Sequence, residues 1–288
     1  SNMFYGCENL TKLDLSNFNT SNVKILYRMF SSCKKLKILD ISSFDTSIVT
    51  DMSELFYNCL ELPSLNLKHF NTSSVQKMTH MFYGCQSLSS LDISSFNTSS
   101  VTQMNNMFMN CKLINSLNLS HFNTNLIKSM YSIFSGCESL TCIDLSNFNT
   151  SLVTNMGSLF NGCKQLTSID ISNFDTSLVK DMSNMFQRCE LITSFNLSNF
   201  DTSSVTTMLN MFSGCINLGY LNLSNFDTSK VTTMNKLFSG CENLNSIDIS
   251  NFNTSLVKDM SYIFSGCSSL SSLIVYNFDT SSVTNMKY

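Results

Sequence analysis

The chain has 288 residues, of which 13% are charged, and its 17 basic and 20 acidic residues give a formal net charge of −3. Proteins that bind nucleic acids by neutralising phosphates need clustered Lys and Arg, so this composition excludes that class. An apolar content of 43% that includes 23 Phe excludes a disordered chain. No window approaches 18 uninterrupted apolar residues, so the sequence predicts no membrane-spanning segment.

The sequence repeats itself every 26 residues from one end to the other. Four columns of identical residues carry the repeat without a single insertion, namely Phe4 to Phe264, Phe18 to Phe278, Cys7 to Cys267 and Thr20 to Thr280. A constant spacing means that every unit contacts its neighbours in the same way. We therefore predict a solenoid of about eleven 26-residue rungs over residues 1–288, because an isolated unit could not bury its apolar side chains.

Two periodicities alternate within each rung. Residues 13–16 alternate apolar and polar side chains, which predicts a short strand, parallel to those of its neighbours. Residues 18–21 read Phe-Asn-Thr-Ser, a sequence typical of a helix start, because these side chains accept hydrogen bonds from free N–H groups. Apolar side chains at 23, 26, 29 and 30 then predict a short helix. A Gly or Asn before the column Cys predicts a left-handed residue that ends it.

The unit resembles a known repeat family. Leu10, Leu13 and Leu15 match the spacing of the leucine-rich repeat signature, and residues 211–234 are similar throughout to the 26-residue repeat of BspA-type bacterial surface proteins. The Phe18 column stands where ordinary leucine-rich repeats have a buried Asn. The backbone groups of that turn are therefore left either to the Thr20 column or to the Asn or Asp before it.

The resemblance has implications for fold, location and function. It implies an α/β leucine-rich-repeat solenoid with a strand and a short helix in each rung. It also implies an extracellular, cell-surface adhesion protein whose signal and anchor lie outside residues 1–288. Neither end carries a polar cap repeat, so we interpret the chain as a fragment of a longer protein.

Few residues suggest metal or thiol chemistry. The column Cys are expected to be buried free thiols, because their Cβ atoms point the same way and are too far apart for disulfides. Cys142 replaces an outward Ser and is either an exposed reactive thiol or a neutral substitute. His69 and His121 lie two rungs apart, too far to share a metal. The outward Asp and Asn column that begins at Asp14 predicts hydrogen-bonded ladders along the sheet in preference to a Ca²⁺ site. We expect no cofactor.

Leucine-rich repeats usually bind ligands on the outward face of the strands, and here that face is nearly uniform in Ser, Asp and Asn. Single deviations from this pattern are the candidate binding residues: Ile38, Lys68, His69, His121, Cys142, Tyr220, Ile274 and Tyr276. The sequence contains neither G-x-S-x-G nor H-E-x-x-H, so it carries no enzyme signature of these classes.

These observations predict a non-catalytic adhesion or protein-interaction module. Its expected partners are surface or matrix proteins, or glycans, of a host or neighbouring cell, with no nucleic acid and no membrane insertion. One alternative is a structural spacer that projects another domain. Another is recognition of glycans or ice by the regular Thr and Ser arrays.

Overall fold

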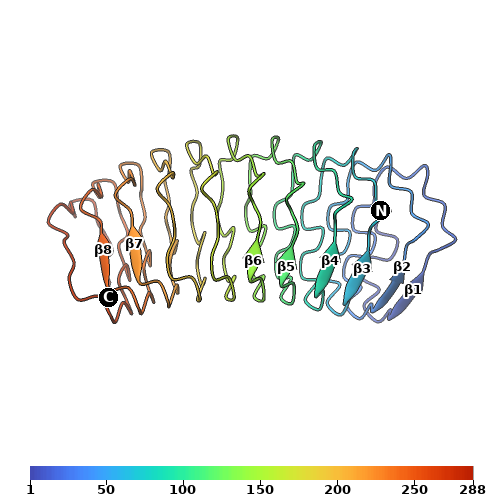
Figure 1. Ribbon diagram of the computed structural model, residues 1–288, viewed down its shortest axis with the longest axis horizontal. Coiled ribbons are helices and arrows are strands. Elements are labelled where there is room, and N and C mark those ends of the chain that lie inside the picture. Colours follow the sequence, from blue (N-terminus) through green and yellow to red (C-terminus); the bar gives the residue numbers. More distant parts are fainter. Residues whose placement is uncertain (288) are drawn as a thin grey trace.

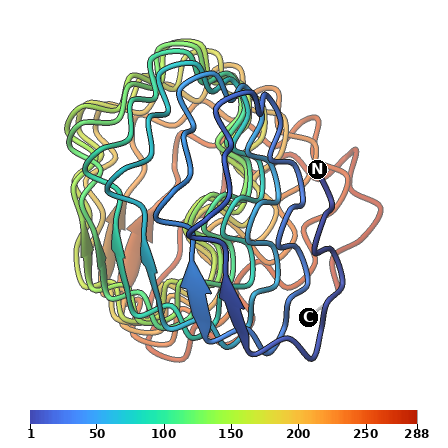
Figure 2. The same cartoon turned by 90° about the vertical axis from the view of Figure 1, so that its right-hand side faces the viewer.

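The structure is a computed structural model that describes residues 1–287, so Tyr288 lies outside the described part of the predicted solenoid. The chain winds into a gently arched solenoid whose rungs follow one another in chain order along the long axis (Figure 1). Viewed from the N-terminal end, successive rungs overlie one another as a coil, with strands along one stretch of its wall (Figure 2). Long-range contacts therefore join each rung to its neighbours.

Short parallel strands form at the alternating pattern in eight rungs, over residues 12–14 in the first, whereas residues 168–171, 194–197 and 272–275, which the structure also describes, form no strand. The strands pair two by two into four small sheets, and within each pair a residue faces its counterpart 26 positions away, as Leu13 faces Leu39 and Leu65 faces Leu91. The side chains on either side of these Leu are exposed, which gives the half-buried pattern of the strand face. The strands are β1 (Lys12–Asp14), β2 (Ile38–Asp40), β3 (Ser64–Asn66), β4 (Ser90–Asp92), β5 (Ser116–Leu117), β6 (Cys142–Ile143), β7 (Tyr220–Asn222) and β8 (Ser246–Asp248).

The predicted short helix is wrong: no helix forms within residues 1–287. A run of tight turns takes its place. The N–H of Met29 donates to the carbonyl of Leu26 at 3.1 Å, and that of Cys33 donates to Phe30 at 3.1 Å. The third residue of each turn has a positive φ, 55° at Arg28 in the first of them. A positive φ at that position defines a type II turn and cannot occur within an α-helix.

The backbone hydrogen bonds explain why turns replace the helix. The turn segment of a rung comprises residues 26–33 or their equivalents. Its alternate N–H groups donate to the next rung, as from Leu26 to the carbonyl of Asp51 at 2.9 Å and from Phe30 to that of Leu55 at 3.0 Å. A helix would bond the same groups four residues back within its own rung. Each turn bonds over three residues, so successive turns reproduce a helix-like spacing of inward side chains. The predicted left-handed residue before the Cys is confirmed, with φ of 73° at Gly136.

The core is built from columns of identical side chains. Rings of the first Phe column stack nearly parallel, with centroids 5.6–6.0 Å apart from Phe4 to Phe264. Rings of the second column, such as Phe70 and Phe226, are also buried. Every rung between the two terminal ones therefore buries its apolar face between two similar rungs, which an isolated unit could not do.

The Thr column completes the turn after each strand. The hydroxyl of Thr124 donates to the carbonyl of Asn149 at 2.8 Å and accepts the N–H of the same residue at 2.8 Å. Thr46 makes the same pair of bonds to Asn71. Both of the groups that the sequence left open bond to the backbone. The Thr bonds to the next rung, and the Asn or Asp before it accepts an N–H of its own rung, as Asn19 does from Ser21 at 3.0 Å. The Thr residues of this column are buried from Thr46 to Thr254. The hypothesis that this column recognises ice is therefore wrong, because its side chains do not reach the surface.

Candidate functional site

The strand face is a polar surface whose acidic groups are held in place locally. A carboxylate oxygen of Asp14 accepts the N–H of Ser16 at 3.0 Å, and Asp92 accepts both the N–H and the hydroxyl of Ser94, at 3.1 and 2.7 Å. The Ser94 hydroxyl first, and then its N–H, hold the pKa of Asp92 below its ordinary value. These bonds lie within one rung, so local turns replace the predicted ladders between rungs. No group of three or more His, Cys, Asp or Glu suited to a metal gathers within residues 1–287.

The apolar and aromatic candidates are all exposed but do not gather into one cluster. Ile38 in β2 is 56% exposed, and Tyr220 in β7 is 55% exposed. They occupy the same column, seven rungs apart, with Cys142 in β6 between them. Ile274 and Tyr276 lie close together near the C-terminal end, where Tyr276 is 84% exposed. The face therefore carries separated side chains and not one pocket.

The basic candidates divide into one exposed group and two structural ones. Lys68 is largely exposed, with its Nζ 3.5 Å from a carboxylate oxygen of Asp92. In contrast, His69 and His121 each place Nε2 at 2.9 Å from a backbone carbonyl of an earlier rung. Asn199 occupies the same column and donates to the equivalent carbonyl, that of Ile171, at 3.3 Å. The two imidazoles therefore support the turn between rungs as the Asn does.

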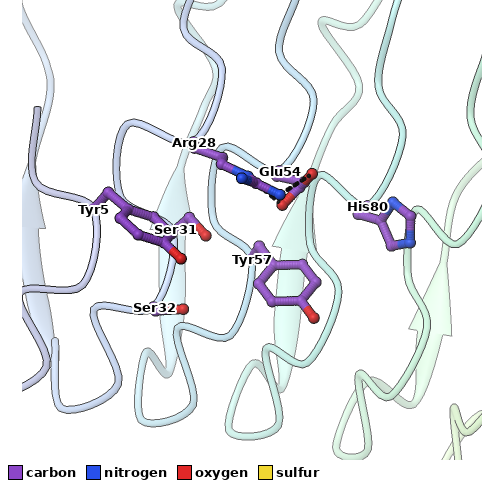
Figure 3. Close-up of a pocket in the computed structure, with 7 residues that line it drawn as sticks. All are labelled: Tyr5, Arg28, Ser31, Ser32, Glu54, Tyr57 and His80. Carbon is purple, nitrogen blue, oxygen red and sulfur yellow. Dashed lines mark hydrogen bonds and ion pairs between the residues drawn. The ribbon is translucent and has the colours of Figure 1, made fainter. Parts of the chain in front are cut away.

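A hollow of about 350 Å³ lies on a part of the molecule that the sequence did not single out. It opens on the turn segments of the first four rungs, as Figure 3 shows. Its lining consists of Tyr5, Arg28, Ser31, Ser32, Glu54, Tyr57 and His80. Aromatic rings, an ion pair and hydroxyl groups therefore face one small volume.

The polar groups of this hollow are mutually fixed. Arg28 donates to Glu54 twice, from Nε at 2.7 Å and from the terminal nitrogen at 3.1 Å. The Tyr27 hydroxyl donates to the same carboxylate at 3.3 Å, and its ring lies 5.0 Å from the guanidinium carbon. Burial lowers the pKa of His80 below its ordinary 6.5. The lining is thus close to neutral near pH 7.

A signal for this hollow was present in the sequence. Asn2, Arg28, Glu54 and His80 occupy one column, in which charged and titratable residues follow one another in successive rungs. A helix with its apolar face at residues 23, 26, 29 and 30 leaves position 28 on its outer side, so the predicted helix indicates no site at this column. Its positive φ values turn it into the corner of successive turns, which brings its side chains beside those of the Tyr5 column.

Comparison with known families identifies the repeat. A family model described as "Mycoplasma protein of unknown function, DUF285" matches residues 1–91, 63–143, 128–219 and 192–288. Together these matches span the chain. The chain belongs to the DUF285 family. A search of curated proteins found none that matches it.

Solved structures of similar fold include bacterial leucine-rich repeat proteins. One from Bacteroides ovatus is 18% identical with a TM-score of 0.49, over 99% of this chain and 76% of that one. A leucine-rich cell surface protein from Faecalibacterium prausnitzii is 19% identical with a TM-score of 0.37, over 97% and 83%. One from Eubacterium ventriosum is 17% identical with a TM-score of 0.41, over 96% and 82%. The DUF285 chain is a solenoid of 26-residue rungs joined by parallel pairing, as the BspA-type leucine-rich repeat in its sequence implies.

The cysteines of this DUF285 chain are all free thiols, as predicted for the column, and they differ sharply in environment. The column thiols are mostly buried, and those from Cys33 to Cys267 each donate to a backbone carbonyl, as Cys137 does to Phe108 at 3.2 Å. Burial raises the pKa of Cys137 to about 12. Cys7 and Cys142 are exposed.

We expect a thiol reagent such as dithionitrobenzoate to label Cys7 and Cys142 rapidly in the folded protein and the buried column slowly, because the thiolate is the reactive form. Absorbance of the released thiolate measures the fast phase. Cys142→Ser should remove half of that phase, and Cys137→Ser should leave it unchanged. Rapid labelling of Cys137 without denaturant would contradict this prediction.

Proposed function

We propose that this solenoid is a non-catalytic interaction module, displayed outside the cell, that binds through its strand face. Parallel strands and turns repeat at one spacing along the axis, so the face is a preorganised surface. Its Asp and Ser side chains are already held by local hydrogen bonds, and little side-chain ordering remains to oppose binding. The described residues include no helix long and apolar enough to cross a membrane.

The observation that carries the proposal is the set of large, exposed side chains that stand singly on this polar face. Tyr and other aromatic residues supply much of the binding energy at protein interfaces. Ile38 and Tyr220 are each more than half exposed and lie seven rungs apart, and the still more exposed Tyr276 lies two rungs beyond Tyr220. Such separated contacts favour a long or multivalent partner, since linked weak contacts gain affinity through effective concentration. Surface or matrix proteins, or glycans, of a host or neighbouring cell have this form.

An array of host-matrix proteins and glycans, probed with the 288-residue chain, tests the proposal. We expect reproducible binding that falls at least fivefold in Tyr220→Ser, because the neighbouring rungs already carry Ser at this position. Lys68→Ser, which introduces the Ser of the next rung, should weaken the same interaction. The matched control is Tyr131→Ser, which removes an exposed Tyr from the turn segment and should leave binding intact.

Two outcomes would contradict the proposal. One is a folded chain that binds nothing on the array. The other is binding that survives both Tyr220→Ser and Lys68→Ser but is lost in Tyr131→Ser. The first would favour the structural spacer, for which the continuous Phe stack is the supporting observation, because it stiffens the rod along its length.

A further inference from the structure

One column of the turn segment contains a vacancy between aromatic rings. Tyr5, Ser31, Tyr57 and Tyr83 occupy equivalent positions on four successive rungs. The rings of Tyr57 and Tyr83 stack, with centroids 4.6 Å apart and planes 10° from parallel. Ser31 carries no ring, so the space between Tyr5 and Tyr57 has the width that one stacked ring would fill. This space, called the slot below, is the hollow that Tyr5, Ser31 and Tyr57 line (Figure 3).

The base of the slot holds a polar atom without a partner. Ser31 is only 1% exposed, and its hydroxyl oxygen is buried with no hydrogen-bond partner. Buried hydroxyls in folded proteins are nearly always bonded, so such an atom calls for an explanation. Ser31 lines the hollow, and Figure 3 shows its side chain between the two Tyr. A ligand hydroxyl that reached the base of the slot would supply the missing bond as the rings adjusted around it.

The rim of the slot carries polar groups that suit the edge of a ring bearing several hydroxyl groups. Arg28 and Glu54 form one side, where they offer both donors and acceptors, and Ser32 lies on another. The guanidinium carbon of Arg28 lies 5.8 Å from the centre of the Tyr5 ring, so the ion pair adjoins the aromatic wall. The faces of the slot are therefore apolar, and its edge and base are polar.

We propose that this slot binds one neutral sugar ring, sandwiched between Tyr5 and Tyr57. The C–H groups on the faces of a pyranose pack against the electron-rich faces of aromatic rings. Its hydroxyls point outward to the Arg28–Glu54 pair and inward to Ser31. The paired charges favour a neutral sugar over a uronic acid, and they disfavour a nucleotide, whose phosphate would need an unpaired cation. A volume of about 350 Å³ suits a single ring.

This site is independent of the strand-face proposal, because its residues belong to the turn segments. Saturation-transfer-difference NMR with the methyl glycosides of glucose, galactose, mannose and N-acetylglucosamine tests it directly. We expect at least one glycoside to bind the wild-type chain with a Kd on the order of 1 mM, since one sugar ring offers few contact atoms. p-Cresol and adenosine serve as flat aromatic probes in the same experiment.

Ser31→Tyr is the decisive variant. It places in the vacancy the residue that the same column carries at Tyr57 and Tyr83, so the backbone accepts it. We expect it to weaken glycoside binding more than tenfold while the circular dichroism spectrum is unchanged. Tyr5→Ala, which truncates one exposed wall, should weaken binding similarly and tests the site again if Ser31→Tyr fails to fold. The matched control is Ser213→Tyr, at the same column but with no Tyr beside it, which should bind as the wild type does.

The proposal is overturned if none of the glycosides binds the folded chain, or if binding persists in both Ser31→Tyr and Tyr5→Ala. It is also overturned if p-cresol or adenosine binds the slot and excludes every glycoside. That result would make the slot a receptor for a flat aromatic group of a partner instead of a sugar.

Discussion

Replacing Phe134 by alanine should lower the free energy of unfolding by about 3–5 kcal/mol. The ring is fully buried and stacks on Phe108 at 5.9 Å and on Phe160 at 5.7 Å. Its removal leaves a cavity in the middle of the aromatic stack, and the neighbouring rungs cannot close around it because their spacing is fixed by backbone hydrogen bonds. Urea-induced unfolding followed by circular dichroism measures the loss.

Phe4→Ala provides the matched control. Phe4 belongs to the same column but is only partly buried, with one described stacking partner, Phe30 at 5.8 Å. We expect its truncation to cost less than half as much as that of Phe134. Equal losses at the two positions would mean that the Phe column does not stabilise the solenoid through two-sided burial.

The second large effect is expected at the Thr column. Thr124→Val keeps the shape of the side chain but removes the hydroxyl that both donates to and accepts from the backbone of Asn149. The partly buried N–H and carbonyl of Asn149 then lose this partner, which should lower the free energy of unfolding by about 1–3 kcal/mol. The same urea titration measures it.

Thr124→Ser separates the contribution of the hydroxyl to stability from that of the methyl group. Serine retains the donor and acceptor, so we expect it to keep most of the stability that the Val variant loses. If Ser were as destabilising as Val, the methyl contact, and not the pair of hydrogen bonds to Asn149, would account for the Thr column.

The sequence predicted the features that repeat with the side-chain pattern and missed those set by hydrogen bonds between rungs. Strand positions, buried Phe and Cys columns and the left-handed residue at Gly136 follow from alternation, apolar periodicity and glycine placement. The helix was predicted wrongly because inward spacing at 23, 26, 29 and 30 fits a helix and successive three-residue turns equally well. Positive φ at a non-glycine residue such as Arg28 has no strong sequence signal, and it decides between the two.

The same error concealed the hollow. The candidate residues were sought on the strand face, where side-chain deviations are visible against a uniform background. Tyr5 and Tyr57 also interrupt a column in which Ser recurs, but that column lies away from the strand face on which leucine-rich repeats usually bind ligands. The unpaired hydroxyl of Ser31 could not be predicted at all, because whether a hydroxyl finds a partner depends on three-dimensional neighbours.

The hydrogen bonds between rungs have a consequence for how such a chain can change in length. The N–H of Leu26 meets the carbonyl of Asp51, and the equivalent groups meet 26 residues later in Met52 and Lys77. Deleting or duplicating a whole 26-residue unit would therefore return each remaining donor to an equivalent acceptor and each ring to an equivalent stack. A deletion of 25 residues would displace all of them at the junction. Unequal recombination between units can thus lengthen or shorten the protein at little energetic cost. The length of the solenoid can therefore change readily during evolution.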